Sequence, residues 1–230
     1  MLALPKRHFY LVARLGVAAL TGCRTAPVVP AGPFEPASLE RLGALADSTM
    51  PSGNELLRIR WRSDDGQVSV SGSGAVRIAP DSLRVDVTVR LGVGRATMIL
   101  TGDDVQAEPP QVVAKLLPDR FALWAAVGVV RLPGGVGQAE RLVDGPRTFW
   151  RVVDAEGRRW IFEMRGHNLA GVVREIDDRP VERLEIFRDQ AGRVSRARAT
   201  DLVRGARFEV DIVSRQPSGA FPVAIWHLGT

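Results

Sequence analysis

The stretch SGSGAVRIAPDSLRVDVTVRL, residues 71–91, contains the alternation that decides the fold. In its second half every other residue is apolar: Leu83, Val85, Val87, Val89 and Leu91. Successive side chains of a strand point to opposite faces, so this spacing predicts a strand with one apolar and one polar face. In the first half, Gly72 and Gly74 lie on the apolar face of another strand, where glycine permits sharp bending and close approach of a neighbour. The two strands, joined by a turn at 80–82, predict a strongly curved sheet.

The same period of two extends in both directions along the chain. We expect strands at 56–62 and 67–79, joined by an Asp-Gly turn, and further strands at 83–91 and 95–101, followed by a short excursion over 103–107. From residue 148 onward, short turns separate seven more segments, as in an antiparallel meander. These segments are 148–154, 158–164, 171–176, 180–188, 193–202, 206–214 and 221–226. The pattern predicts about eleven strands in all.

Three segments have helical spacing instead, at 38–46, 109–117 and 119–127. The last begins after Asp119, a residue suited to capping, and stops at Gly128. Three helices are too few to cover a large open sheet. We therefore expect a mostly β protein of the α+β type, in which the antiparallel sheet curls and the helices fill its hollow side.

The N-terminus resembles a bacterial lipoprotein signal. Lys6 and Arg7 precede a short apolar run, and the segment 20–23 (Leu-Thr-Gly-Cys) resembles a lipobox, whose cysteine receives the lipid. The alternative is an ordinary secretory signal. Acyl chains such as palmitate on Cys23 would anchor the protein, at about 0.8 kcal/mol per buried CH₂. We predict a signal peptide over 1–22, a lipidated and flexible tether over 23–36, and one folded domain over 37–230.

Composition narrows the classes of function. The formal charge is +5, but removal of residues 1–22, which hold three basic residues and no acidic one, would lower it to +2. Net charge therefore gives no support to nucleic-acid binding. Cys23 is the only cysteine, which excludes an intramolecular disulfide and a cysteine-based metal site.

The order of elements is similar to that of the LolA/LolB superfamily of periplasmic lipoprotein carriers and receptors. The resemblance is strongest over 71–87, continues into Arg90-Leu91-Gly92, and includes Trp124 and the Leu-Pro-Gly segment at 132–134. It implies an incomplete, highly curved β-barrel with helices over its concave side. It also implies that Leu91 and Gly92 form a loop that transfers cargo at the membrane, although the family loop has a proline where this chain has Arg90. The alternative is that Leu91 is a core residue.

The resemblance further implies an apolar cavity on the concave side that holds acyl chains of a lipoprotein or lipid. Transfer would need no chemistry, because the cargo moves to whichever site buries its chains better. Each cavity candidate has a simpler alternative role as ordinary core. The candidates are Trp61, Val85, Val87, Met98, Trp124, Trp160 and Phe162.

We find no catalytic constellation in the sequence. The acidic pairs at 64–65, 103–104 and 177–178 each lie at a predicted turn, which explains them without catalysis. His167 and His227 have no metal-ligand spacing, and neither a nucleophile elbow nor a phosphate loop is present. We expect no enzyme activity, no cofactor and no metal.

These observations favour a LolB-like receptor or carrier that acts in outer-membrane lipoprotein localisation. It would be lipid-anchored, most simply in the outer membrane and facing the periplasm, with a periplasmic carrier protein as a partner. The alternative from another class is an envelope sensor or assembly subunit that binds a protein, and a hydrolase of lipid or cell wall is the least favoured.

Overall fold

The computed structural model describes residues 29–89 and 94–229. Within them, thirteen antiparallel strands form one sheet in the order β1-β7-β8-β9-β10-β11-β12-β13-β2-β3-β4-β5-β6. The strands are β1 (Glu35–Ala37), β2 (Asn54–Asp64), β3 (Ser69–Ala79), β4 (Ser82–Val89), β5 (Arg95–Thr101), β6 (Asp104–Glu108), β7 (Ala139–Asp144), β8 (Arg147–Val153), β9 (Arg159–Arg165), β10 (Asn168–Ile176), β11 (Arg179–Arg188), β12 (Val194–Asp201) and β13 (Arg207–Ser218).

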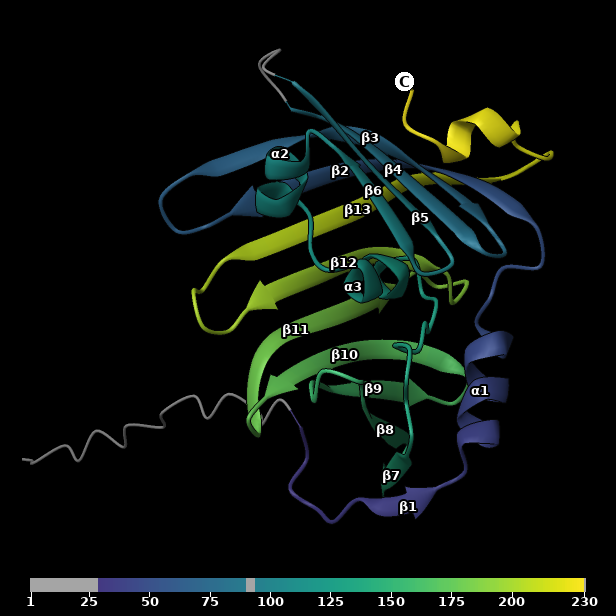
Figure 1. Ribbon diagram of the computed structural model, residues 1–230, viewed down its shortest axis with the longest axis vertical. Coiled ribbons are helices and arrows are strands. Elements are labelled where there is room, and N and C mark those ends of the chain that lie inside the picture. The colour runs from purple at the N-terminus through teal and green to yellow at the C-terminus, as the bar shows by residue number, and fades with distance from the viewer. Residues whose placement is uncertain (1–28, 90–93, 230) are drawn as a thin grey trace, which may run out of the picture.

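The sheet is strongly curved but not closed, because its first strand β1 and its last strand β6 do not pair with each other. Figure 1 shows the sheet wrapped around a hollow side that holds α3. The two halves of the sheet meet where β13 pairs with β2, with Val210 opposite Trp61. The predicted incomplete barrel is therefore confirmed, with thirteen strands in place of about eleven.

Two glycines explain how the sheet can curve this tightly. A Cβ atom on Gly72 would lie 1.8 Å from the carbonyl oxygen of Thr88, and one on Gly74 would lie 2.4 Å from that of Asp86. Both carbonyls belong to β4, the partner strand of β3. Only glycine permits this approach, as the sequence pattern predicted.

Three α-helices occur in the described residues: α1 (Leu39–Ser48), α2 (Pro110–Leu116) and α3 (Arg120–Ala126). Helix α1 begins at Ser38, whose hydroxyl accepts a hydrogen bond from the Arg41 backbone N–H, and buries Leu42 and Ala46. Its last turn is tied to the chain after α3, because the Thr49 hydroxyl accepts a hydrogen bond from the Val130 N–H at 2.8 Å. All three helices match the predicted segments within a few residues.

One large apolar core joins the inward faces of the strands to all three helices. A second, smaller cluster on β8–β10 consists of Phe149, Ile161 and Val173, and Val29 and Phe34 pack against it. Residues 29–36, which the sequence places in a flexible tether, thus contribute to the fold from Val29 onward. Glu35 and Pro36 pair with β7, so this part of the tether prediction is wrong.

One other local prediction is wrong, and one strand was missed. Residues 221–226 do not form a strand, because Val223–Trp226 is a 3₁₀ helix that lies against β4 and β5. Conversely, β7 was not predicted. Its side chains lack a clean apolar alternation, and it is specified by pairing with β8 and β1.

In the part of the chain that the structure describes, no helix combines the length and apolar character needed to cross a membrane.

Candidate functional site: the concave face beneath helix α3

Helix α3 is the element that fills the hollow side of the sheet. Its sequence, RFALWAA, is apolar after the first residue, and residues 121–126 are all buried. A helix that is apolar on every side is stable only when it is enclosed. The Asp119 carboxylate caps its start by accepting a hydrogen bond from the Phe121 N–H at 2.9 Å. The helix ends at Gly128, whose φ of +93° suits glycine.

Aromatic contacts fix α3 against both halves of the sheet. Phe121 meets Trp160 of β9 edge to face, with ring centroids 4.9 Å apart. On the other side, the Arg131 guanidinium lies 4.6 Å from the Trp124 ring centroid. Arg131 also donates a hydrogen bond to the Pro80 carbonyl at 3.0 Å, which connects this contact to the turn before β4.

A small apolar hollow lies between α3 and the strands at the junction of β13 and β2. Its volume is about 20 Å³, which is room for about one water molecule. Every residue around it is apolar, so nothing would hold that water by hydrogen bonds. The hollow is lined by Leu57, Ile59, Val76, Val85, Leu123, Ala126, Val127, Phe208, Val210 and Ile212.

The seven predicted cavity residues all lie in the large core cluster, and each is less than a tenth exposed. The structure therefore brings them together on the concave side. Of the seven, only Val85 borders the hollow. The other lining residues come mainly from the apolar faces of β2, β3 and β13, which the sequence reveals by alternation, and from α3. The pairing of β13 with β2 decides which of these apolar faces meet under α3. The alternation of apolar and polar residues within a strand does not specify that pairing.

Trp61 carries a buried polar atom that has no hydrogen-bond partner among the described residues. Its side chain is 3% exposed, and its ring stacks on Phe208 with centroids 6.4 Å apart. The indole Nε1 is buried and makes no hydrogen bond within the described residues. Trp61 reaches this position because Gly72, directly opposite it on β3, has no side chain.

Beneath Phe121, a buried carboxylate holds Trp160 in place. The Asp154 Oδ2 atom accepts hydrogen bonds from the Trp160 indole at 3.1 Å and from the Arg158 guanidinium at 2.7 Å. Burial by itself would raise the pKa of Asp154, but the hydrogen bonds from Arg158, Trp160 and two backbone N–H groups outweigh it and lower that pKa. The carboxylate is therefore charged at neutral pH and serves as a structural support.

The acidic pairs act as turn residues, as the sequence predicts. The Asp65 carboxylate accepts hydrogen bonds from the backbone N–H groups of Gln67 and Val68, and Asp177 and Asp178 adopt positive φ angles in a turn. Among the residues that the structure describes, no group of three or more His, Cys, Asp or Glu side chains is arranged to hold a metal ion.

Comparison by sequence finds no matching family model and no matching curated protein. Comparison by structure finds a LolA superfamily protein, NE2245, from Nitrosomonas europaea, with a TM-score of 0.60 and 10% identity. The match covers 84% of this chain and 98% of that one. The chain has the LolA-like fold. A Vibrio parahaemolyticus domain assigned to outer membrane lipoprotein sorting also matches, with a TM-score of 0.49, 8% identity, and coverage of 81% of this chain and 94% of that one.

In this LolA-like fold, the large apolar core lies on the concave face of the sheet. Three predicted site residues lie outside the described residues: the lipidation site Cys23 and the transfer-loop residues Leu91 and Gly92. Their roles stay predictions.

Proposed function

We propose that this protein is a lipid-anchored, non-enzymatic envelope protein that binds acyl chains of lipoproteins or lipids between α3 and the curved sheet, as a LolB-like receptor or carrier. The observation that carries the proposal is the wholly apolar hollow beneath α3. The LolA-like fold supports it, since the structural match to a LolA superfamily protein extends along most of both chains.

A hollow of about 20 Å³ cannot admit an acyl chain while α3 stays in place. The chain must therefore displace α3 and take over its contacts. Removing Phe121, Leu123 and Trp124 from the core costs roughly 5–9 kcal/mol, at about 1.5–3 kcal/mol for each side chain. A chain of about 15 methylenes recovers ~12 kcal/mol on burial, at about 0.8 kcal/mol each. The difference of about 3–7 kcal/mol favours binding, and it is much smaller than the ~12 kcal/mol of burial alone, so the exchange with α3 helps a carrier or receptor to release its cargo.

Helix α3 is suited to such an exchange because it is short and bounded by Pro118 and Gly128. Its seven residues are too few to be stable as an isolated helix. Its helical form therefore depends on its contacts with the sheet.

Replacing Ala126 with phenylalanine is expected to abolish acyl-chain binding. Ala126 lies on α3, is 5% exposed and borders the hollow, so a benzyl group there would close the hollow at which the acyl chain begins to displace α3. The measurement is mass spectrometry of lipid that co-purifies with the full chain in mild detergent. We expect acyl-chain lipid with the wild type and at least a tenfold decrease with Ala126→Phe.

Ala191→Phe is the matched control, because Ala191 is exposed in the β11–β12 turn. This variant should retain the lipid. Absence of lipid from the folded wild type, or equal retention by Ala126→Phe, would contradict the acyl-chain proposal. Such a result would favour the alternative function, an envelope sensor or assembly subunit that binds a protein and whose core is simply filled.

Replacing Cys23 with serine is expected to remove the membrane anchor. The thioether cannot form on serine, so labelled palmitate should not be incorporated, and the protein should leave the membrane fraction at high salt. Gel fluorography and membrane fractionation measure the two effects. Palmitate labelling of Cys23→Ser at the wild-type level would rule out lipidation at this residue.

A further inference from the structure

The convex face of β2–β5 contains a groove that the proposed function does not use. Its volume is about 1150 Å³, and its floor is formed by small residues of β3, Ser73, Gly74 and Ala75. The polar faces of β2, β4 and β5 flank this floor, and the C-terminal segment forms one wall. Five arginines and one aspartate line it: Arg58, Arg60, Arg77, Arg84, Arg95 and Asp86.

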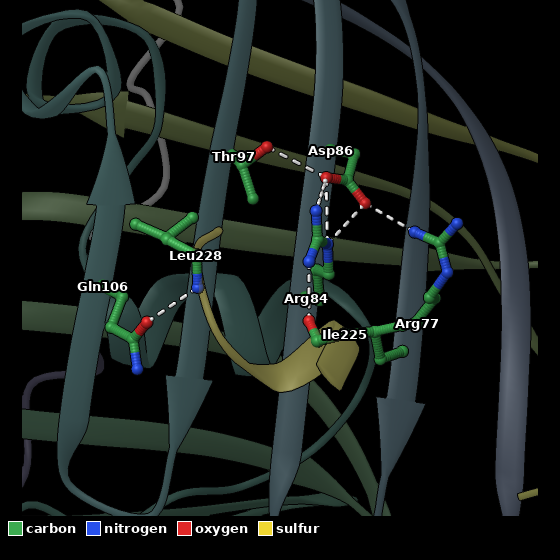
Figure 2. Close-up of polar contacts among 7 residues, drawn as sticks. All are labelled: Arg77, Arg84, Asp86, Thr97, Gln106, Ile225 and Leu228. Atoms are coloured by element: carbon green, nitrogen blue, oxygen red, sulfur yellow. Dashed lines mark hydrogen bonds and ion pairs between the residues drawn. The ribbon is translucent and has the colours of Figure 1, made fainter. Parts of the chain in front are cut away.

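The C-terminal segment is held on this face by two hydrogen bonds. Figure 2 shows the Arg84 guanidinium donating to the Ile225 carbonyl, at 2.6 Å, and the Leu228 N–H donating to the Gln106 Oε1 atom, at 3.1 Å. The 3₁₀ helix Val223–Trp226 is thereby fixed over β4 and β5. The wall of the groove is therefore a built part of the fold, on the face opposite α3.

The single acidic residue of the groove is already occupied. The Asp86 carboxylate accepts hydrogen bonds from Arg84, from Arg77 and from the Thr97 hydroxyl (Figure 2). Burial acts to raise the pKa of Asp86, but the contacts with Arg84, Thr97 and Arg77 outweigh it and lower that pKa, so the group stays charged. The one negative charge of Asp86 is therefore shared by Arg77 and Arg84, and no other acidic residue lines the groove in the described part of the chain.

Arg58, Arg60 and Arg95 form no ion pair with any residue that the structure describes, and all three are exposed. Arg60 and Arg95 end a row that crosses four strands through Ser73 and Thr88. At about 4.8 Å per strand, their Cα atoms are roughly 14 Å apart, with two hydroxyl groups between them. Asp211 lies beside Arg60 on β13, but its carboxylate is bound to Arg196 at 2.6 Å.

An apolar strip borders these arginines. Val213 is the unpaired residue of a β-bulge in β13 and is 56% exposed, and Ala224 and Ile225 line the groove from the C-terminal wall. A free phosphate ion would make no use of such a strip. An anionic amphiphile would use both parts, with its phosphate on the arginines and its apolar portion on the strip.

We propose that this convex groove binds the phosphate head group of an anionic phospholipid. Arg60 and Arg95 hold the phosphate oxygens, the Ser73 hydroxyl donates from the floor, and Val213 and Ile225 contact the apolar part of the lipid. The Thr88 hydroxyl already donates to the Ser73 carbonyl at 3.0 Å and so stays part of the floor. This site is separate from the hollow under α3 and does not depend on acyl-chain transfer.

The test is calorimetric titration of the full chain in non-ionic detergent with dihexanoyl phosphatidylglycerol, dihexanoyl phosphatidylcholine and inorganic phosphate. We expect the anionic lipid to bind at least about tenfold more tightly than either other probe. Arg60→Gln with Arg95→Gln should weaken it at least about tenfold, since two charge-assisted contacts are lost. The matched control is Arg165→Gln with Arg204→Gln, which removes two exposed charges outside the groove and should leave binding unchanged.

Ala126→Phe should also bind the anionic lipid as the wild type does, which separates this groove from the hollow under α3. Equal binding of phosphatidylcholine, binding of inorganic phosphate as tight as that of the lipid, or an equal loss in the two double variants would each overturn the proposal.

Discussion

Replacing Gly72 with alanine is expected to destabilise the protein by about 4 kcal/mol, the largest effect of any single methyl group that we anticipate. The added Cβ would lie 1.8 Å from the Thr88 carbonyl oxygen and 2.9 Å from the Trp61 Nε1 atom. Neither neighbour is the free end of a flexible side chain, because one is backbone and the other is a buried ring. Strands β3 and β4 would have to separate, and the curvature of the sheet would decrease.

Urea unfolding followed by tryptophan fluorescence measures this loss, and thermal unfolding should show a decrease in Tm of about 10 °C. Gly43→Ala is the matched control. Gly43 lies in α1 with nothing within 4 Å of its Cβ position, so the same substitution should stabilise the protein by about 0.5–1 kcal/mol. If Gly72→Ala were as stable as the wild type, the close approach of β3 and β4 would not be what curves the sheet.

Replacing Asp154 with alanine is expected to cost about 3–4 kcal/mol. The carboxylate is 3% exposed and accepts four hydrogen bonds, two from backbone N–H groups and two from the Arg158 and Trp160 side chains. Its removal leaves a buried indole N–H and a guanidinium without their acceptor, which costs more than the bonds themselves. Since Trp160 supports Phe121 of α3, the helix should also be held less firmly.

The chain contains its own control for Asp154. Asp189 begins a turn of the same form, Asp-x-x-Gly-Arg, and accepts hydrogen bonds from the backbone N–H groups of Ala191 and Arg193. The Asp189 side chain is 37% exposed, and its described hydrogen-bond partners are Ala191 and Arg193 and include no tryptophan. Asp189→Ala should therefore cost only about 1 kcal/mol. Equal losses of unfolding free energy in Asp154→Ala and Asp189→Ala would show that the backbone hydrogen bonds of the turn stabilise the protein and that the Trp160 contact does not.

The sign of the pH dependence follows from the lowered pKa of Asp154. Its contribution to stability is complete above the unfolded-state pKa near 3.8 and is lost as the pH falls through the lower folded-state value. Between pH 7 and pH 3, the wild type should therefore lose more free energy of unfolding than Asp154→Asn. Parallel curves for the two proteins would contradict this assignment.

Much of the fold could be predicted from the sequence because strand alternation is a local property. The apolar face of β4, the glycines of β3 and the three helices were all identified from residues within one segment. Predictions failed where the structure depends on distant partners. Strand β7 has little pattern of its own and is specified by β8 and β1, whereas the apolar residues at 221–226 belong to a 3₁₀ helix packed on β4 and β5.

For the candidate sites too, local patterns predicted some features and tertiary packing decided the others. The resemblance implied that Trp61, Val85 and Trp160 line an apolar cavity; all three lie in the large core cluster, and of the three only Val85 borders the hollow. The sequence did not predict that α3 would reduce the enclosed space to about 20 Å³, because volume depends on how side chains from several strands fit together. Nor did it predict the convex groove, whose arginines appear in the sequence only as the polar members of alternating strands.

By itself, the sequence determined which residues face inward and which face outward, because that choice follows from the period of each strand. Only the tertiary structure decided which strands became neighbours, and so which outward arginines share a groove and which inward residues share a hollow. The physical reason is that alternation fixes the direction of a side chain relative to its own strand. The pairing of β13 with β2, whose residues are about 150 positions apart, depends on the whole core being buried at once.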